Sequence, residues 1–541
     1  MSRRSFVAAA AVAGTAMLVP HRSSAAATLA DRGAGAAAPP PVFALEELSI
    51  TELQAGMASG RFSARSLVEQ YLGRIESMDR QGPALRHVIE TNPDAPAIAD
   101  ALDAERRGGH MRGPLHGIPV LVKDNIDTAD RMTTTAGSLA LEGSRPARDA
   151  FVVERLRAAG AIILGKTNLS EWANFRSTHS SSGWSARGGQ GRNPYVLDRT
   201  PSGSSSGSGG AVAASYCAVA VGTETDGSVT SPAAACSLVG MKPTIGLVSR
   251  SGIIPIAHSQ DTAGPMARSV TDAAILLGVL AGADPRDAVT TTRRPAAADY
   301  VRALDAGALR GARIGVARKS YTGYSAATDA AFEQAVGAMR DAGAVIIDPA
   351  DIATAGKFDD AEFEVLLYEF KADLEAYLRA LPTGARARTL DDLIAFNKAH
   401  AATELRYFGQ EIFEMAAKKG PLTAPAYRKA LDKCRLLSRT QGLDATFRKH
   451  RLDTLVAPTQ GPPSVIDLVN GEKYSGSSTT PCAVAGYPAV TVPMGYAFGL
   501  PLGVTFMGLP WSEAALLKYA YAFEQATKLR RPPQYLRTAE L

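Results

Sequence analysis

Three segments of the sequence carry side chains that could together hydrolyse an amide. Lys123 ends the apolar run IPVLVK (118–123), serines and glycines fill SGSSSGSGG (202–210), and TETDGSVTSPA (223–233) follows another apolar run. Amide hydrolysis needs a nucleophile, a group that carries its proton, and donors for the developing oxyanion. Serine, lysine and a tight glycine-containing turn can supply all three.

The spacing of these residues excludes the compact form of serine–lysine chemistry. No lysine in the chain has a serine three residues before it, so the Ser-x-x-Lys pattern is absent. A lysine acts as a base only if its pKa lies well below about 10.4, and burial at a strand end can lower it. Any serine–lysine site must therefore be assembled by the fold from distant segments.

Two other pattern matches suggest different chemistry. Residues 160–167 (GAIILGKT) fit the phosphate-loop pattern, but the apolar residues between the glycines are typical of a buried strand, so we reject it. Residues 203–207 (GSSSG) fit the nucleophile elbow of α/β-hydrolases, with Ser205 as the nucleophile and a later histidine as the base. A Ser/His esterase is therefore the alternative hypothesis, and the histidines that could serve it are His258, His400 and His450.

The sequence resembles the amidase signature family from about residue 45 to residue 533. The motifs that carry the resemblance are LHGIPVLVKDNID (115–127), AGAIILGKTNLSEWA (159–173), SGSSSGSGGAVAA (202–214), GTETDGSVTSPAAACSLVGMKPTIGLVSRSGI (222–253), DTAGPMARSVTDAA (261–274) and YPAVTVPMGYAFGLPLGVTFMG (487–508). The resemblance implies a Ser-Ser-Lys triad, in which Ser228 is the nucleophile, Ser204 the bridging serine and Lys123 the base.

The resemblance also implies an oxyanion hole and a supporting serine. The oxyanion would be bound by backbone amides, and Ser205 would support the site by hydrogen bonding. The residues expected to supply those amides are Thr225, Asp226, Gly227 and Ser228. The implied reaction is hydrolysis of a carboxamide C–N bond through a serine acyl-enzyme.

The GTETDGS form resembles the subgroup of bacterial peptide amidases, which remove the amide from C-terminal peptide amides. The expected partner is therefore a peptide or small-molecule amide; aryl, fatty-acyl and lactam amides remain alternatives. The family likeness also leaves open a component of a tRNA-dependent amidotransferase and a catalytically silent amide-binding protein. We expect no cofactor and no metal, and buried free thiols at Cys217, Cys236, Cys434 and Cys482.

The elements that must position these residues indicate an α/β fold. Amphipathic VVERLRAAG (152–160) lies between two apolar runs, and this strand–helix–strand order indicates parallel pairing. Strands are predicted at 118–123, 161–164, 218–222, 313–317, 345–348 and 452–458. We expect one large domain with a mixed central β-sheet flanked by α-helices, and a helical insertion at about 358–451.

The N-terminal segment predicts where the protein is sent and where its folded domain begins. Paired arginines before the uncharged apolar run 6–19 are typical of a twin-arginine signal peptide, which predicts a leader at 1–27 and export to the periplasm or the medium. The run is too short for a stable membrane span of about 20 residues. Small residues and prolines predict a flexible linker at 28–42, followed by the amidase domain at 43–541.

The chain of 541 residues is 46% hydrophobic and carries a formal charge of +5. Arg3, Arg4 and Arg22 of the leader account for three of these charges, leaving +5 − 3 = +2. The remaining basic side chains are scattered among nearly as many acidic ones, so we expect no nucleic acid partner. The oligomeric state is not predicted by any feature of the sequence.

Overall fold

The computed structural model describes residues 43–292 and 299–540. The chain separates into two units, Met1–Phe43 and Ala44–Leu541, and the second holds all the helices and strands described below. The signal peptide predicted at 1–27 and the linker predicted at 28–42 lie outside the described residues and stay predictions. Within the described ranges, no helix combines the length and the apolar character that a membrane span requires.

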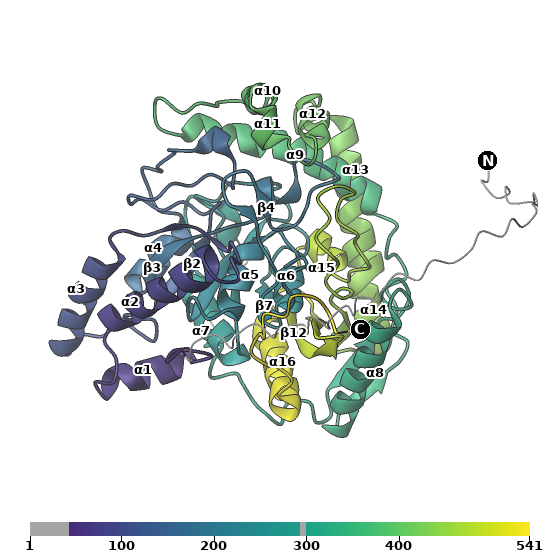
Figure 1. The fold of residues 1–541 in the computed structure, drawn as a ribbon. Coiled ribbons are helices and arrows are strands. Elements are labelled where there is room, and N and C mark those ends of the chain that lie inside the picture. The colour runs from purple at the N-terminus through teal and green to yellow at the C-terminus, as the bar shows by residue number, and fades with distance from the viewer. Residues whose placement is uncertain (1–42, 293–298, 541) are drawn as a thin grey trace, which may run out of the picture. The chain divides into compact units, whose positions relative to one another are not determined.

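The second unit is built on a mixed sheet of eleven strands in the order β1-β3-β2-β6-β8-β7-β12-β13-β11-β9-β10 (Figure 1). The strands are β1 (Val88–Thr91), β2 (Pro119–Lys123), β3 (Ile162–Thr167), β6 (Val219–Glu224), β7 (Val239–Lys242), β8 (Thr262–Ala267), β9 (Arg313–Val316), β10 (Val345–Ile347), β11 (Thr454–Pro458), β12 (Ala489–Ala497) and β13 (Leu500–Met507). A separate hairpin pairs β4 (Trp184–Ser185) with β5 (Gly189–Gln190).

The strand pairing confirms the predicted α/β class. β2 runs parallel to both β3 and β6, and β9 runs parallel to β10 and β11, whereas the other pairs are antiparallel. Every predicted strand lies on an observed one. The run 160–167 is buried and mostly strand β3, so its match to the phosphate-loop pattern has no structural basis.

Helices flank this sheet (Figure 1). They are α1 (Ile50–Ala58), α2 (Ala64–Ile75), α3 (Ala95–Arg107), α4 (Phe151–Ala158), α5 (Ser206–Ala213), α6 (Thr230–Ala235), α7 (Val270–Leu280), α8 (Ala326–Asp341), α15 (Thr480–Ala485) and α16 (Glu513–Thr527). Local chemistry fixes where several of them begin. The Ser49 hydroxyl accepts a bond from the amide of Glu52 while the Glu52 carboxylate accepts one from the amide of Ser49, which is a capping box at the start of α1.

Between 359 and 450, every regular element is helical. These elements are α9 (Asp359–Ala380), α10 (Leu390–Ala399), α11 (Ala401–Glu404), α12 (Glu411–Ala417), α13 (Pro425–Arg435), a π-helical turn (Leu436–Leu443) and α14 (Asp444–His450). Apolar residues of α9, α10 and α12 share one core with the loop after β3. Within that core, Trp172 meets Phe413 edge to face at 5.7 Å, so these helices pack directly against a loop that leads to the site.

Close backbone packing explains why the serine-rich segment also needs its glycines. A Cβ at Gly207 would lie 2.3 Å from the carbonyl oxygen of Asn168 and 2.5 Å from that of His87. Neither backbone oxygen can rotate away. We therefore expect Gly207→Ala to lower the free energy of unfolding by about 3 kcal/mol, measured as a fall in the urea midpoint.

Gly73→Ala is the matched control for this prediction. Gly73 lies inside α2, and a Cβ there meets nothing within 4 Å. This change should be neutral or stabilising by about 0.5–1 kcal/mol, because alanine favours a helix over glycine. Equal urea midpoints for the two variants would contradict the packing argument.

Candidate active site

Lys123 is the last residue of β2 and is fully buried. Its Nζ lies 2.8 Å from Ser204 Oγ, 2.9 Å from Thr223 Oγ1 and 3.3 Å from the carbonyl oxygen of Thr223. The parallel register of β2 and β6 pairs Val122 with Val221, and this brings the ends of the two strands level. The sheet itself therefore sets the amine beside Thr223.

The surroundings of this amine favour its neutral form. Burial lowers the pKa of Lys123 from 10.5 to about 7, more than the charges of Asp261 and Glu224 raise it. A neutral amine has two N–H donors, which suit the two oxygens of Thr223, and one lone pair, which then points toward the hydroxyl of Ser204. The arrangement can accept a proton from that hydroxyl.

The serine-rich loop is held against β6 by Ser205. The Ser205 hydroxyl donates to the carbonyl oxygen of Thr223 at 3.0 Å and accepts from the amide of Thr223 at 3.2 Å. Gly222 makes this approach possible, since a Cβ there would lie 2.8 Å from Ser205 Oγ. The peptide bond between Gly203 and Ser204 is cis. The bonds of Ser205 thus hold the residue next to Ser204 against β6.

The turn that carries Ser228 is joined to this loop through the backbone. The amide of Ser205 donates to the carbonyl oxygen of Ser228 at 3.1 Å. Gly227 adopts φ +76°, and a Cβ there would lie 2.9 Å from the side-chain oxygens of Ser231 and Thr479. Only glycine fits this position without strain. Ser228 is 8% exposed, and no hydrogen bond among the described residues joins its Oγ to that of Ser204.

Four consecutive backbone amides of this turn are free to bind a ligand. Within the described ranges, none of them donates a hydrogen bond; they belong to Thr225, Asp226, Gly227 and Ser228. The next two amides, of Val229 and Thr230, donate to the Glu224 carboxylate at 2.7 and 2.9 Å. Glu224 therefore satisfies the start of α6 and leaves the preceding amides for an oxyanion.

The Asp226 side chain anchors the turn to the C-terminal part of the chain. Its carboxylate accepts from Thr479 Oγ1 at 2.5 Å and from Thr480 Oγ1 at 2.7 Å. Burial raises the pKa of Asp226 to about 6. Turn chemistry alone would explain an Asp-Gly pair, but this carboxylate has a further structural role.

Several residues that support the site were missed by the sequence analysis. Thr225 is held from the loop before β8: its hydroxyl donates to Asp261 at 2.6 Å, and Gln260 donates to its carbonyl oxygen at 3.3 Å. Gln260 also donates to Glu362 of α9 at 2.8 Å, which ties the helical region to the turn. Thr223 lies within the recognised GTETDGS motif, and Asp261 is the first residue of the recognised motif at 261–274, whereas the sequence gives no local signal for Gln260.

The histidines do not support the Ser/His alternative. His258 Nδ1 lies 2.8 Å from Asp373 Oδ2, and His258 Nε2 lies 3.4 Å from Glu369 Oε1. Burial opposes its charged form, but the two carboxylates outweigh burial and raise the pKa of His258 above 6.5. His400 stacks on Phe396 instead, and the Ser205 hydroxyl is committed to Thr223.

Three potential metal ligands meet at the same place. Ligand atoms of His258, Glu369 and Asp373 lie within 4.8 Å of one another. Tyr427 and the amide of Ser259 already donate to the Glu369 carboxylate, at 2.7 and 2.9 Å. These contacts place the imidazole of His258 as a bridge between two acids. The four cysteines are buried and free, as predicted.

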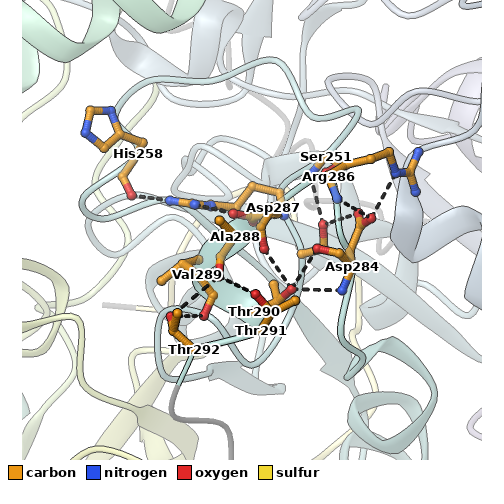
Figure 2. A network of polar contacts seen from close by, with 12 residues as sticks. Ser251, His258, Asp284, Arg286, Asp287, Ala288, Val289, Thr290, Thr291 and Thr292 are labelled. Atoms are coloured by element: carbon orange, nitrogen blue, oxygen red, sulfur yellow. Dashed lines mark hydrogen bonds and ion pairs between the residues drawn. The ribbon is translucent and has the colours of Figure 1, made fainter.

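A cavity of about 220 Å³ adjoins the site. Its lining includes Asn125 and Thr223, which share a 3.0 Å hydrogen bond, and Thr225 of the candidate oxyanion turn. Figure 2 shows a polar network that includes Arg286 and Asp287 of this lining: Asp284 accepts from Arg286 at 2.9 Å, and Thr290 donates to the carbonyl oxygen of Asp287 at 2.8 Å. The apolar side of the lining comes from Ala173, Ile253, Ile254, Pro255 and Ile256.

Comparison with known families decides what kind of protein presents this site. The family model described as Amidase matches residues 66–517. The chain belongs to the amidase family. It is therefore a hydrolase acting on C–N bonds in linear amides. This confirms the family predicted from the motifs.

The relatives of this amidase include a plant protein and solved bacterial structures. A probable amidase of Arabidopsis thaliana is 42% identical over 504 residues, covering 91% of this chain and 93% of its own length. The crystal structure of native peptide amidase from Stenotrophomonas maltophilia is 52% identical, with a TM-score of 0.87, and covers 91% of this chain and 100% of its own. A glutamyl-tRNA(Gln) amidotransferase subunit from Chloroflexus aurantiacus is 36% identical, covering 90% of this chain and 97% of its own length.

Proposed function

We propose that this amidase removes the terminal amide of C-terminally amidated peptides by means of Ser228, Ser204 and Lys123. The observation that carries the proposal is the buried amine of Lys123, which lies 2.8 Å from Ser204 Oγ and has a pKa of about 7. Likeness to a peptide amidase at 52% identity, also crystallised with the competitive inhibitor chymostatin, supports the substrate class.

In the acylation step, Ser228 Oγ forms a bond to the carboxamide carbon. Its proton passes to Ser204 Oγ, and the proton of Ser204 passes to the neutral amine of Lys123. The negative oxygen that develops is bound by the free amides of residues 225–228. The proton then returns to the leaving nitrogen, the C–N bond breaks, and ammonia departs from the acyl-enzyme.

Deacylation repeats this sequence with water. Lys123, neutral again, draws a proton from water through Ser204, and the resulting hydroxide forms a C–O bond to the acyl carbon. Ser228 Oγ leaves and recovers a proton. The sum is one carboxamide and one water consumed, and one carboxylic acid and one ammonia released. In the free enzyme the hydroxyls of Ser228 and Ser204 need not yet be bonded, because catalytic hydrogen bonds commonly shorten when substrate binds.

The direct test is ammonia release from a panel of carboxamides. We expect C-terminally amidated dipeptides to be turned over with a kcat/KM at least tenfold above that for benzamide and for a fatty-acyl amide. Turnover of aryl or fatty-acyl amides with amidated dipeptides left intact would contradict the proposed substrate class while leaving the triad intact.

The dependence of activity on pH tests the base. Lys123 must be neutral, so the active form is present above its pKa of about 7 and is lost as pH falls through that value. We expect kcat/KM for an amidated dipeptide to fall about tenfold per pH unit below pH 6 and to level off above pH 8. A rate that is independent of pH between 5 and 8 would exclude this lysine as the base.

The amidotransferase relatives suggest a second candidate function. In this case the chain would be a subunit of a tRNA-dependent amidotransferase. The amidotransferase subunit is 36% identical to this chain, whereas the peptide amidase is 52% identical. Hydrolysis is therefore the better supported of the two functions. The predicted export signal also argues against a protein that needs cytosolic partners. Hydrolysis of an amidated dipeptide by the isolated chain distinguishes the two.

A further inference from the structure

A second and much larger cavity, of about 910 Å³, lies apart from the triad. Five segments line it: the loop 82–86, the β4–β5 hairpin with its flanks, residues 402–407 in and just after α11, the loop 465–468, and Arg537 near the C-terminus. None of Lys123, Ser204 and Ser228 lines it. The fold thus assembles this cavity from parts of the chain that the proposed reaction does not use.

Four arginines line this cavity, and each comes from a different segment. Arg86, Arg192, Arg406 and Arg537 are all exposed, and among the described residues their guanidinium groups form no ion pair and no side-chain hydrogen bond. The acidic residue in the lining is Asp198, and its carboxylate already pairs with Arg199 at 3.1 Å. The cavity therefore carries uncompensated positive charge.

The smaller cavity beside the triad differs in this respect. Its arginines are paired with carboxylates, Arg250 with Asp287 at 2.9 Å and Arg286 with Asp284 at 2.9 Å. Like charges gathered in a concave site repel one another and raise the local concentration of anions. Guanidinium groups match the paired oxygens of phosphate with two parallel hydrogen bonds. An anion with several such groups would neutralise the repulsion.

We propose that this cavity binds a small soluble oligophosphate, an anion that carries two or more linked phosphate groups. Several phosphate groups are required because four arginines line one volume, and a single phosphate could engage only some of them. The volume is in the range of ligand-binding pockets. Tyr407 is part of the lining, and its ring lies 5.6 Å from that of Trp184 and 5.2 Å from the guanidinium of Arg406.

The test is calorimetric titration of the whole chain with sodium tripolyphosphate at low salt, with orthophosphate as the weaker reference. We expect tripolyphosphate to bind at least tenfold more tightly than orthophosphate. R192Q/R406Q removes two of the four charges and should weaken tripolyphosphate binding by tenfold or more. R537Q, a single change near the C-terminus, should weaken tripolyphosphate binding by a smaller factor. It provides a second measurement if the double variant folds poorly.

R340Q/R428Q is the matched control, because it removes the same charge elsewhere. Arg340 on α8 and Arg428 on α13 are exposed and form no side-chain ion pair among the described residues. Tripolyphosphate affinity should be unchanged in this variant, and amidase turnover should be unchanged in all three variants.

Three outcomes would overturn the proposal. The first is an absence of binding at 50 mM salt. The second is an equal loss of affinity in R192Q/R406Q and R340Q/R428Q, which would mean general charge attraction. The third is binding to phosphatidylglycerol vesicles without binding to tripolyphosphate, which would assign the arginines to a lipid surface. The outcome is independent of the proposed triad, because neither the cavity nor the probe involves it.

Discussion

Lys123→Met is expected to reduce kcat for an amidated dipeptide by about 10⁴-fold, with the chain still folded. In the parent, Lys123 Nζ lies 2.8 Å from Ser204 Oγ. Methionine fills a similar volume but cannot accept the proton of that hydroxyl. Losses of this size are typical when one member of a catalytic triad is removed. Ammonia release under saturating substrate measures the effect.

The same variant should melt no lower than the parent at pH 7. Burial opposes the charge of Lys123 and lowers its pKa to about 7. Because the unfolded chain holds this amine charged at pH 7, its burial lowers the free energy of unfolding. Replacing the amine relieves this cost. The control is Lys242→Met, at another fully buried lysine, whose Nζ donates to the carbonyl oxygen of Pro243 at 3.1 Å. If both variants lost activity equally, Lys123 would have no special role.

Ser228→Ala is expected to abolish both turnover and covalent labelling. In the parent, a fluorophosphonate should react with Ser228 Oγ, the one hydroxyl that Ser204 and Lys123 are proposed to activate. We expect kcat to fall by about 10⁴-fold or more and the labelled peptide to disappear from the mass spectrum. Retained labelling in this variant would place the nucleophile at another residue.

Ser205→Ala separates this hypothesis from the Ser/His alternative. Ser205 Oγ is bound to the backbone of Thr223 on both sides, as donor and as acceptor, so its loss should lower kcat through misplacement of the loop. The fluorophosphonate should still be found on Ser228. Under the alternative hypothesis, Ser205→Ala would remove the label and Ser228→Ala would leave it in place.

The sequence predicted the parts of the site that lie within short, regular segments. Lys123 ends a strand whose apolar run is unmistakable, and the strands 161–164 and 218–222 on either side of it are equally plain. The pattern thus predicted that Lys123 lies at the end of a buried strand, whereas its role as the base was implied by the resemblance to the amidase signature family.

What the sequence did not predict depends on contacts between distant residues. β7 and β8 were missed because VGMK and TAGPMA contain glycine and proline, which lower strand propensity, although burial fixes both segments in the sheet. Gln260, which donates to the carbonyl oxygen of Thr225, precedes the recognised motif at 261–274, and no pattern of its own points to the site. The arginines of the large cavity are scattered singly through the chain, so only the fold brings them together.

The carboxylate of Asp226 meets hydroxyls that follow it by 253 and 254 residues. Those hydroxyls belong to Thr479 and Thr480, so more than four-fifths of the polypeptide must be synthesised before the turn that carries Ser228 can form these bonds. A nascent or truncated chain would therefore hold every proposed triad residue and still lack a settled oxyanion turn. The attachment of this turn to its distant partners is therefore expected to be a late event of folding.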